Sequence, residues 1–317
     1  MTLHHVPATP ETCRWGTFDA SYKPVVTVQS GDTVVLECVS GGPNTLPPAA
    51  LGLVVPPALL AIHASSLPRG PGHIITGPVA IEGAMPGDML AVHIDKIEFG
   101  ADWGFCGFRP LSGTLPDEFE APFLSHLTID RARNTCRLPY GVELPLSPFF
   151  GVMGVAPRPS YGTLSTVQPR ENGGNLDNKE LGEGSTLFLP VLAPGGLFSA
   201  GDGHGVQGDG EVCINALEIC LTGTFTFTLH KKSGAEPALS YPRGETDTHY
   251  ISMGMNEDLD AAMRQALRQM IDFICARSNL PREEAYQFCS LAVDFHVTQT
   301  VNGEKGIHGM LKKGLLF

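Results

Sequence analysis

The chain carries the sequence PGDMLAVHI at residues 86–94, a turn followed at once by a strand-forming run. Gly87 permits the left-handed backbone of a tight turn, and Asp88 can accept hydrogen bonds from nearby backbone amides. The apolar and β-branched residues that follow predict a strand at residues 89–94. This turn-and-strand unit indicates a β-rich fold.

Similar units lie on both sides of it. Residues 30–37 read SGDTVVLE, which repeats the Gly-Asp turn before a strand-forming run. The runs PVVTV at residues 24–28 and VAIE at residues 79–82 are also typical of strands. We therefore expect the first 230 residues to be mostly β, with the two Gly-Asp turns hinting at related sub-units.

The pattern becomes helical beyond residue 256. Apolar residues of the segment 259–274 fall on one face of a helix, and Asn256 is the expected N-cap. A second helix is expected from Pro281 to Asp294, followed by a last strand at residues 295–301. The sequence thus predicts an α+β, β-rich protein with two helices near its C-terminus.

Two long segments lack a regular pattern. Residues 40–74 are rich in Gly, Pro and Ala and predict an ordered loop or lid. Residues 100–148 are irregular but carry several aromatic residues, which predicts an excursion over the main body. The length of 317 residues is consistent with a single domain, 1–317, with sub-units at 1–150 and 151–317.

Composition limits the partners and the location. The net charge is −12 without a long basic cluster, which excludes nucleic acid as an expected partner. The sequence has no apolar window long enough for a membrane span and no signal peptide, and its eight cysteines are scattered. We therefore expect a cytoplasmic protein with free thiols and no membrane partner.

The segment from Gly201 to Glu211, GDGHGVQGDGE, is the main candidate for chemistry. It has five glycines in eleven positions, interleaved with Asp202, His204 and other polar residues. Such a loop can bring carboxylate oxygens and an imidazole nitrogen to one point, and these are ligands for zinc or a similar divalent ion. A tight hairpin with solvated acidic side chains is an equal alternative. The apolar runs at 187–191 and 212–214, expected to be flanking strands, favour a site.

Two further clusters are weaker. Asp177, within the segment NGGNLDNK at 172–179, could be a metal ligand or a general base, although a plain loop is the simpler interpretation. His73 lies between a Gly/Pro loop and a buried strand and could supply an imidazole or merely cap the strand. A serine nucleophile lacks its G-x-S-x-G setting. Cys213, two residues beyond Glu211, leaves a cysteine nucleophile open, but its apolar neighbours favour a buried structural role.

Taken together, these motifs resemble the acetamidase/formamidase family. The resemblance rests on four ordered motifs and extends from about residue 24 to the end of the chain. The motifs are ITGPV at 75–79, GAMPGD at 83–88, NGGNLDN at 172–178, and GDGH at 201–204 with QGDGE at 207–211.

The resemblance implies a β-sandwich or barrel core with two C-terminal helices packed on it. It also implies hydrolysis of the C–N bond of a small amide, such as formamide, acetamide or a larger or cyclic amide, to a carboxylate and ammonia. The apolar C-terminal residues 314–317 and the family suggest a homo-oligomer.

Our hypothesis from the sequence is that His204, Asp202 and Glu211, aided by His73, hold a divalent metal. Zinc is the favoured ion and calcium the alternative. The same hypothesis gives roles to three other residues. Asp177 or Asp209 would move protons, and Asn175 would orient the amide.

Two rival functions remain at this stage. One is a cysteine-dependent amidase on the same fold. The other is a non-catalytic protein, stabilised by calcium, that binds a small ligand.

Overall fold

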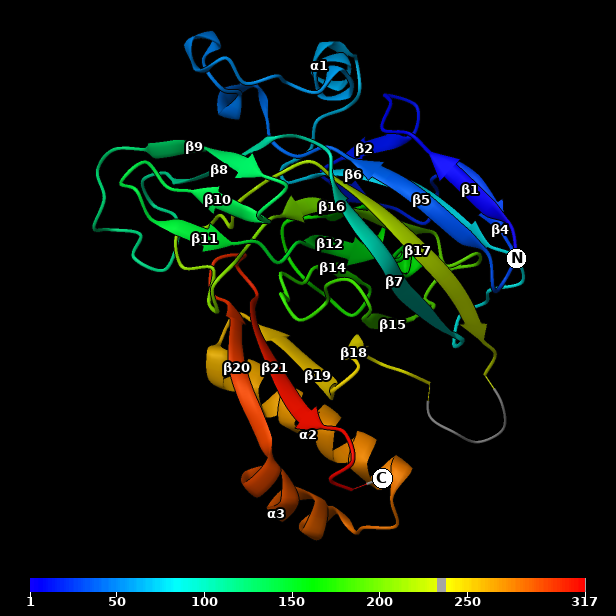
Figure 1. Cartoon of the computed structure of the whole chain (residues 1–317). Helices are drawn as coiled ribbons and strands as arrows, with labels where there is room; N and C mark the ends of the chain where they lie inside the picture. The colour runs from blue at the N-terminus through cyan, green and yellow to red at the C-terminus, as the bar shows by residue number, and fades with distance from the viewer. Residues whose placement is uncertain (233–237, 317) are drawn as a thin grey trace.

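The computed structural model describes residues 1–232 and 238–316, and its largest element is a nine-stranded sheet. The strand order is β1-β5-β17-β7-β15-β18-β19-β21-β20 (Figure 1). Strands from both halves of the chain meet in it, because β7 lies between β17 and β15. Its strands are β1 (Leu3–Val6), β5 (Thr33–Cys38), β7 (Met89–Phe99), β15 (Thr186–Pro190), β17 (Leu221–His230), β18 (Arg243–Glu245), β19 (His249–Asn256), β20 (Val293–Gln299) and β21 (Lys305–Lys312).

A six-stranded sheet packs against one part of the nine-stranded sheet. Its order is β14-β12-β16-β6-β2, and β4 pairs in parallel with β6. Strands β6, β12, β14 and β16 are entirely buried, which explains their run of apolar and glycine residues. The strands are β2 (Cys13–Trp15), β4 (Val26–Val28), β6 (Ile74–Ile81), β12 (Phe149–Gly154), β14 (Gly173–Asn175) and β16 (Phe198–His204).

Aromatic side chains fill the space between the two sheets. Phe198 of β16 meets Phe225 and Phe227 of β17 edge to face, with ring centroids 5.6 and 5.3 Å apart. Phe150 of β12 packs on Phe225 at 5.3 Å. All four rings are fully buried, so the two sheets form a sandwich with an aromatic centre.

The two segments expected to be irregular contain regular elements. Within residues 40–74, where we predicted a loop or lid, the structure has η1 (Pro43–Thr45), η2 (Ala49–Leu51) and the helix α1 (Pro57–Ala64). The loop prediction was wrong for α1 because Pro57 sits in the first turn of the helix, where proline is tolerated, and Leu59 and Ile62 are buried.

Residues 100–148, predicted to be irregular, form an antiparallel sheet of four strands in the order β11-β10-β9-β8. A further two-stranded sheet joins β3 to β13, next to η3 (Pro159–Tyr161). The bounds are β3 (Thr17–Phe18), β8 (Trp103–Phe108), β9 (Phe123–Asp130), β10 (Thr135–Arg137), β11 (Glu143–Pro145) and β13 (Leu164–Ser165).

Two C-terminal helices cover the far end of the nine-stranded sheet, where β18–β21 lie (Figure 1). Helix α2 (Leu259–Arg277) packs on β19 and β21, and α3 (Arg282–Ala292) packs on α2. The predicted N-cap of α2 was two residues too early. Asp258, rather than Asn256, is the N-cap and accepts a hydrogen bond from the Ala261 amide, whereas the Asn256 side chain accepts from the Asp258 amide.

The predicted fold class is therefore confirmed: a β-rich sandwich core with two C-terminal helices packed on it. Strands 24–28, 33–37, 79–82 and 89–94 correspond to β4, β5, β6 and β7, and 295–301 to β20, with shifted ends. None of the helices in the described part of the chain is long and apolar enough to cross a bilayer.

Candidate metal centre and active site

His204 lies at the centre of the candidate site, as the last residue of the buried strand β16. Its side chain is fully buried, with Nδ1 3.0 Å from Oε1 of Gln207. The other nitrogen, Nε2, lies 3.3 Å from Oδ2 of Asp202, 3.4 Å from Oε1 of Glu218 and 3.9 Å from Oδ1 of Asp177. One imidazole nitrogen is thus held by an amide, and the other faces a group of carboxylates.

Four acidic residues lie around the His204 side chain and come from different parts of the chain. Asp177 follows β14, Asp202 is in β16, Glu211 lies in the following loop and Glu218 precedes β17. Each is at most 6 % exposed. Carboxylates buried this deeply are unstable as a group unless cations or hydrogen bonds compensate for the lost water.

The sequence prediction of one tight loop from Gly201 to Glu211 was wrong for its first part. Residues 201–204 continue β16, and the chain leaves the strand only after His204. Gly203 makes this packing feasible, because an added Cβ would lie 2.3 Å from the Ile219 carbonyl. The expected strand at 212–214 is also absent from the described structure; Glu211 and Ile214 have left-handed φ values of +44° and +80°, which turn the chain.

Three of the acidic residues share an unusual backbone conformation. Asp177, Asp202 and Glu211 have φ values of +46°, +56° and +44°. This left-handed region favours glycine, and each such residue typically costs about 1–3 kcal/mol. Three of the seven described non-glycine residues with positive φ are therefore carboxylates of this one site.

His73 forms the more exposed edge of the site. Its Nε2 lies 3.6 Å from Oδ2 of Asp202, and its side chain is 26 % exposed. The backbone amide of His73 donates to Oγ1 of Thr166, which fixes the segment just before β6. A second imidazole therefore reaches the cluster from the direction of solvent.

Gly151 provides the space in which these side chains meet. A Cβ at this position would lie 2.5 Å from Oδ1 of Asp177, 2.6 Å from Oδ2 of Asp202 and 2.9 Å from Cε1 of His204. Residue 151 lies in the middle of β12, so the strand borders the cluster with backbone alone.

The charges of the cluster shift one another's pKa values. Burial raises the pKa of Glu211 and Glu218 well above the ordinary range, and neighbouring carboxylates add to the effect. Burial likewise raises the pKa of Asp177. Burial opposes the ionised form of Asp202 as well, but the imidazoles of His73 and His204 hold its pKa below the usual range.

His204 responds in the opposite direction. Burial disfavours its charged form, yet the nearby Glu218 and Asp202 raise its pKa well above the ordinary value. Positive charge at this point is therefore strongly favoured by the surrounding carboxylates.

The donor set fits a divalent cation. The buried atoms Nε2 of His204, Oδ1 of Asp177 and Oε2 of Glu211 have no hydrogen-bond partner among the described residues. Asp177, His204 and Glu211 offer ligand atoms within 4.8 Å of one another, and so do Asp202, His204 and Glu218. Imidazole nitrogen with carboxylate oxygen suits zinc and similar ions, and a cation here would compensate the buried negative charge.

The residues predicted from the sequence are placed as follows. His73, Asp177, Asp202, His204 and Glu211 lie together.

The other two predicted residues make contacts outside the carboxylate cluster. The Asn175 side chain donates from Nδ2 to the Val167 carbonyl at 3.2 Å, and its Oδ1 is buried without a partner in the described structure. Asp209 turns away: its Oδ2 lies 3.1 Å from Nδ1 of His296 and its Oδ1 3.4 Å from Nζ of Lys179.

Three residues of the site were not predicted. Glu218 completes the carboxylate group, Asn302 donates from Nδ2 to Oδ2 of Asp177, and Gln207 holds His204. Glu218 had a detectable signal, because it is a single acidic residue within the apolar run ALEICL at 216–221. Asn302, in the segment between β20 and β21, had no comparable signal in the sequence.

A cavity of about 230 Å³ adjoins the cluster beneath the four-stranded sheet. Glu211 and Gln207 line it from the side of the site. Apolar side chains form most of the remaining wall, among them Leu127, Leu144 and Leu217. A polar centre therefore borders a small, largely apolar chamber, an arrangement typical of a ligand site.

The fold and the site together define a β-sandwich protein with a buried histidine–carboxylate centre. A model of the acetamidase/formamidase family matches residues 13–163 and 160–305, and the chain belongs to this family, as the motifs indicated.

Relatives and solved structures agree with this assignment. The chain is 30 % identical over 205 residues to an acetamidase of Mycolicibacterium smegmatis, covering 45 % of this chain and 49 % of that protein. It is 26 % identical over 191 residues to a formamidase of Methylophilus methylotrophus, covering 44 % and 47 %. The matched part spans about half the length of these curated relatives.

Two crystal structures share the whole fold. An acetamidase from Bacillus halodurans has a TM-score of 0.82 at 31 % identity, covering 97 % of both chains. An acetamidase from Yersinia enterocolitica has a TM-score of 0.85 at 27 % identity, covering 99 % of this chain and 93 % of that one.

Proposed function

We propose that this protein hydrolyses the C–N bond of a small linear amide to a carboxylate and ammonia. One observation carries the proposal: His204 lies among four buried carboxylates, and this cluster borders a small chamber. The chain also belongs to the acetamidase/formamidase family. The names of the acetamidase and formamidase relatives supply the reaction class.

We further propose that the activity depends on a divalent metal, with zinc as the favoured ion. Nε2 of His204 would hold it together with carboxylates of Asp177, Asp202, Glu211 and Glu218. Such an ion polarises a carbonyl and lowers the pKa of bound water to about 7, which an unreactive neutral amide requires.

Glu211 is the best-placed group for proton transfer. It belongs to the carboxylate cluster and also lines the chamber. Burial raises the pKa of Glu211 above the ordinary value, which favours the protonated carboxyl that can donate to the leaving nitrogen. Glu211 would accept a proton as the oxygen of water adds to the carbonyl carbon, and would donate it to the nitrogen as the C–N bond breaks.

Asn175 and Asp177 have supporting roles in this proposal. The free Oδ1 of Asn175 is suited to accept an N–H of the bound amide and thereby orient it. Asp177 is fixed by the Asn302 side chain, so it would hold its place while the substrate changes. Asp209 has no part in this proton transfer, because its carboxylate engages His296 and Lys179.

The chamber suggests which amides fit. Its volume of about 230 Å³ exceeds what formamide alone needs, and its apolar wall favours an alkyl group on the acyl carbon. We therefore expect acetamide and somewhat longer aliphatic amides to be better substrates than formamide.

An ammonia-release screen on metal-analysed protein tests the proposal. The panel is formamide, acetamide, butyramide, benzamide and a lactam, with protein before chelation, after chelation and after zinc is restored. We expect release from aliphatic amides, loss on chelation and recovery with zinc. Release that survives complete metal removal would refute metal dependence, and no release from any amide would favour a ligand-binding protein.

A cysteine nucleophile is the second candidate mechanism, and one observation favours it. Cys213 is half-buried, lines the same chamber, and its Sγ lies 3.8 Å from Sγ of Cys106. A hydrogen bond from Cys106 lowers the pKa of Cys213 to about 6. The variant Cys213→Ser separates the two mechanisms: the metal mechanism predicts nearly unchanged turnover, and a cysteine mechanism predicts its loss.

Assembly and location stay predictions. The apolar C-terminal residues favour a homo-oligomer, which size-exclusion chromatography with light scattering would test, and a cytoplasmic location is expected from composition.

A further inference from the structure

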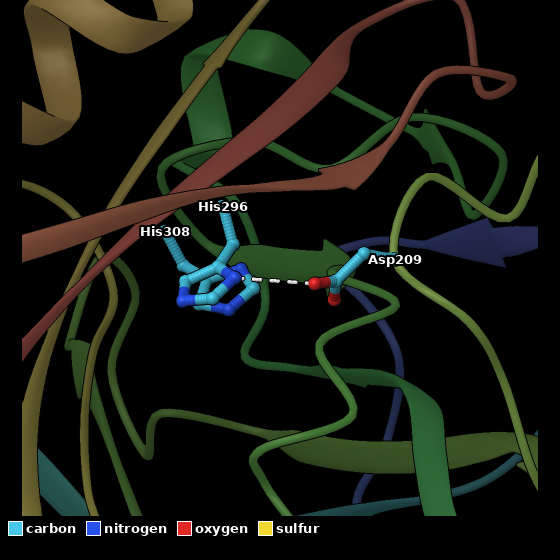
Figure 2. A group of neighbouring side chains, drawn as sticks. All are labelled: Asp209, His296 and His308. Atoms are coloured by element: carbon cyan, nitrogen blue, oxygen red, sulfur yellow. Dashed lines mark hydrogen bonds and ion pairs between the residues drawn. The ribbon is translucent and has the colours of Figure 1, made fainter.

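A second group of metal-ligating side chains lies outside the site described above. Figure 2 shows the imidazoles of His296 and His308 stacked on each other, with the Asp209 carboxylate at their edge. The ring centroids are 5.1 Å apart with an interplanar angle of 11°. Each of the three residues offers a ligand atom within 4.8 Å of the other two.

The atoms of this group are oriented by neighbouring contacts. Oδ2 of Asp209 lies 3.1 Å from Nδ1 of His296. Nδ1 of His308 is 2.7 Å from Oγ1 of Thr298, which fixes the ring and leaves Nε2 as its free nitrogen. A histidine whose one nitrogen is held by a hydroxyl and whose other nitrogen is free is prepared for metal binding.

A buried nitrogen of His308 without a hydrogen-bond partner also indicates a ligand at this group. Its side chain is fully buried, yet Nε2 has no hydrogen-bond partner among the described residues. Leaving such a nitrogen unsatisfied is unfavourable, and a metal ion would satisfy it. Burial also lowers the pKa of His308 to about 4, so the ring is neutral and able to coordinate at neutral pH.

The surroundings are compatible with a cation. Lys179 is the nearby positive group, but its Nζ lies 2.7 Å from Oε1 of Glu180 and 3.4 Å from Oδ1 of Asp209, so acidic groups compensate its charge. Asp209 and His296 are 38 % and 39 % exposed at their side chains, which gives an ion and its waters a path from solvent.

We propose that Asp209, His296 and His308 form a second metal site that binds zinc or a similar transition-metal ion. Two nitrogens and one oxygen make calcium and magnesium poor fits, because these ions prefer oxygen ligands only. Three protein ligands would leave further positions to water.

The role of this ion is to fasten the loop that carries Glu211. The loop is already joined to β20 by hydrogen bonds from the Gly210 amide to the Thr298 carbonyl and from the Thr300 amide to the Gly210 carbonyl. Asp209 lies in this loop, whereas His296 and His308 lie in the paired strands β20 and β21. An ion between them would hold Glu211, two residues away, in position.

Metal stoichiometry of purified protein tests the site independently of amide hydrolysis. Chelated protein is titrated with zinc chloride, followed by calorimetry and by metal analysis after gel filtration. We expect His296→Gln and His308→Gln each to bind one equivalent less than the unmodified protein, and His230→Gln, at an exposed histidine that ends β17, to bind the full amount. Equal stoichiometry in the protein and His296→Gln would overturn the proposal.

A second comparison distinguishes the Asp209–His296–His308 site from the His204 centre. His204→Gln, which disables the His204 centre, should still bind one equivalent of zinc. The double variant His204→Gln with His296→Gln should not bind that equivalent. A single variant at His204 that removes all zinc would contradict the second site. Because His296 is partly exposed, its substitution keeps the test valid if His308→Gln fails to fold.

Discussion

Oε1 of Gln207 accepts from Nδ1 of His204 at 3.0 Å, while the amide nitrogen of Gln207 donates to the Asp177 carbonyl at 2.8 Å. This contact places the proton of the imidazole on Nδ1 and directs Nε2 to the carboxylates. Gln207 therefore positions both the histidine and one acidic segment of the site.

The variant Gln207→Leu should lower metal affinity and kcat about 10- to 100-fold, because the histidine loses its orienting partner. KM is measured together with kcat, because the Gln207 side chain also lines the chamber. Metal titration and ammonia release measure the two effects, and Gln287→Leu on the exposed face of α3 is the control. Normal metal affinity in Gln207→Leu would contradict the positioning role.

Gly151→Ala should abolish metal binding and activity while leaving the fold intact. The added methyl group would enter the centre, 2.5 Å from Asp177 and 2.6 Å from Asp202. Circular dichroism, metal analysis and ammonia release measure the outcome. Gly208→Ala is the matched control, because an added Cβ there meets nothing within 4 Å. Full activity in Gly151→Ala would show that the side chains do not converge at this point.

Glu218→Gln should stabilise the metal-free protein but weaken its binding of metal. Burial raises the pKa of Glu218, so the folded state holds more protons than the unfolded chain, and its contribution to stability falls as pH rises. Metal-free Glu218→Gln should therefore be more stable at pH 8 than the unmodified protein, by about 1 kcal/mol or more. Its affinity for metal should fall at least about tenfold.

Urea unfolding in chelator at pH 8 and zinc titration check these two results. Glu118→Gln, at an exposed position, serves as the control. A variant that is destabilised without metal would show that Glu218 is stabilised by contacts rather than strained by burial.

His308 should make the metal-free protein sensitive to acid. Its pKa is lowered from 6.5 to about 4 by burial. Between these values the unfolded chain binds a proton that the folded protein excludes, so the free energy of unfolding falls as pH decreases. The full shift corresponds to roughly 3 kcal/mol at about 1.4 kcal/mol per pH unit.

Urea unfolding of chelated protein from pH 7.5 to pH 4 measures this loss. His308→Gln should not show this loss. On acidification, the free energy of unfolding of the unmodified protein should therefore fall by roughly 3 kcal/mol more than that of His308→Gln. Parallel pH profiles would refute the prediction.

The strand-forming runs made a β-rich fold predictable and the family resemblance added the sandwich, whereas α1 and the four-stranded sheet were missed. The runs at residues 33–37 and 89–94 and the helical repeat at 259–274 are signals that lie within a few neighbouring residues. The proline-rich segment before α1 obscured a helix of eight residues whose stability comes from packing of Leu59 and Ile62.

The site was predictable where its residues cluster in the sequence. Asp202, His204 and Glu211 lie within eleven positions, so the sequence predicted that they bind one metal ion together. Glu218 and Asn302 join them through the pairing of β16 with neighbouring strands and the turn after β20, which no local pattern reveals. Asp209 shows the converse: it is near Glu211 in the chain, but its carboxylate contacts His296 and Lys179 instead of the cluster.

The left-handed backbone at Asp177, Asp202 and Glu211 has a consequence for how the sequence can change over time. If folding were the only requirement, mutation would drift these positions toward glycine, which adopts such φ values without strain. Keeping an acidic side chain there opposes the preference of the backbone. The acidic identity of these three positions is therefore explained by what the carboxylates do and not by what the backbone prefers.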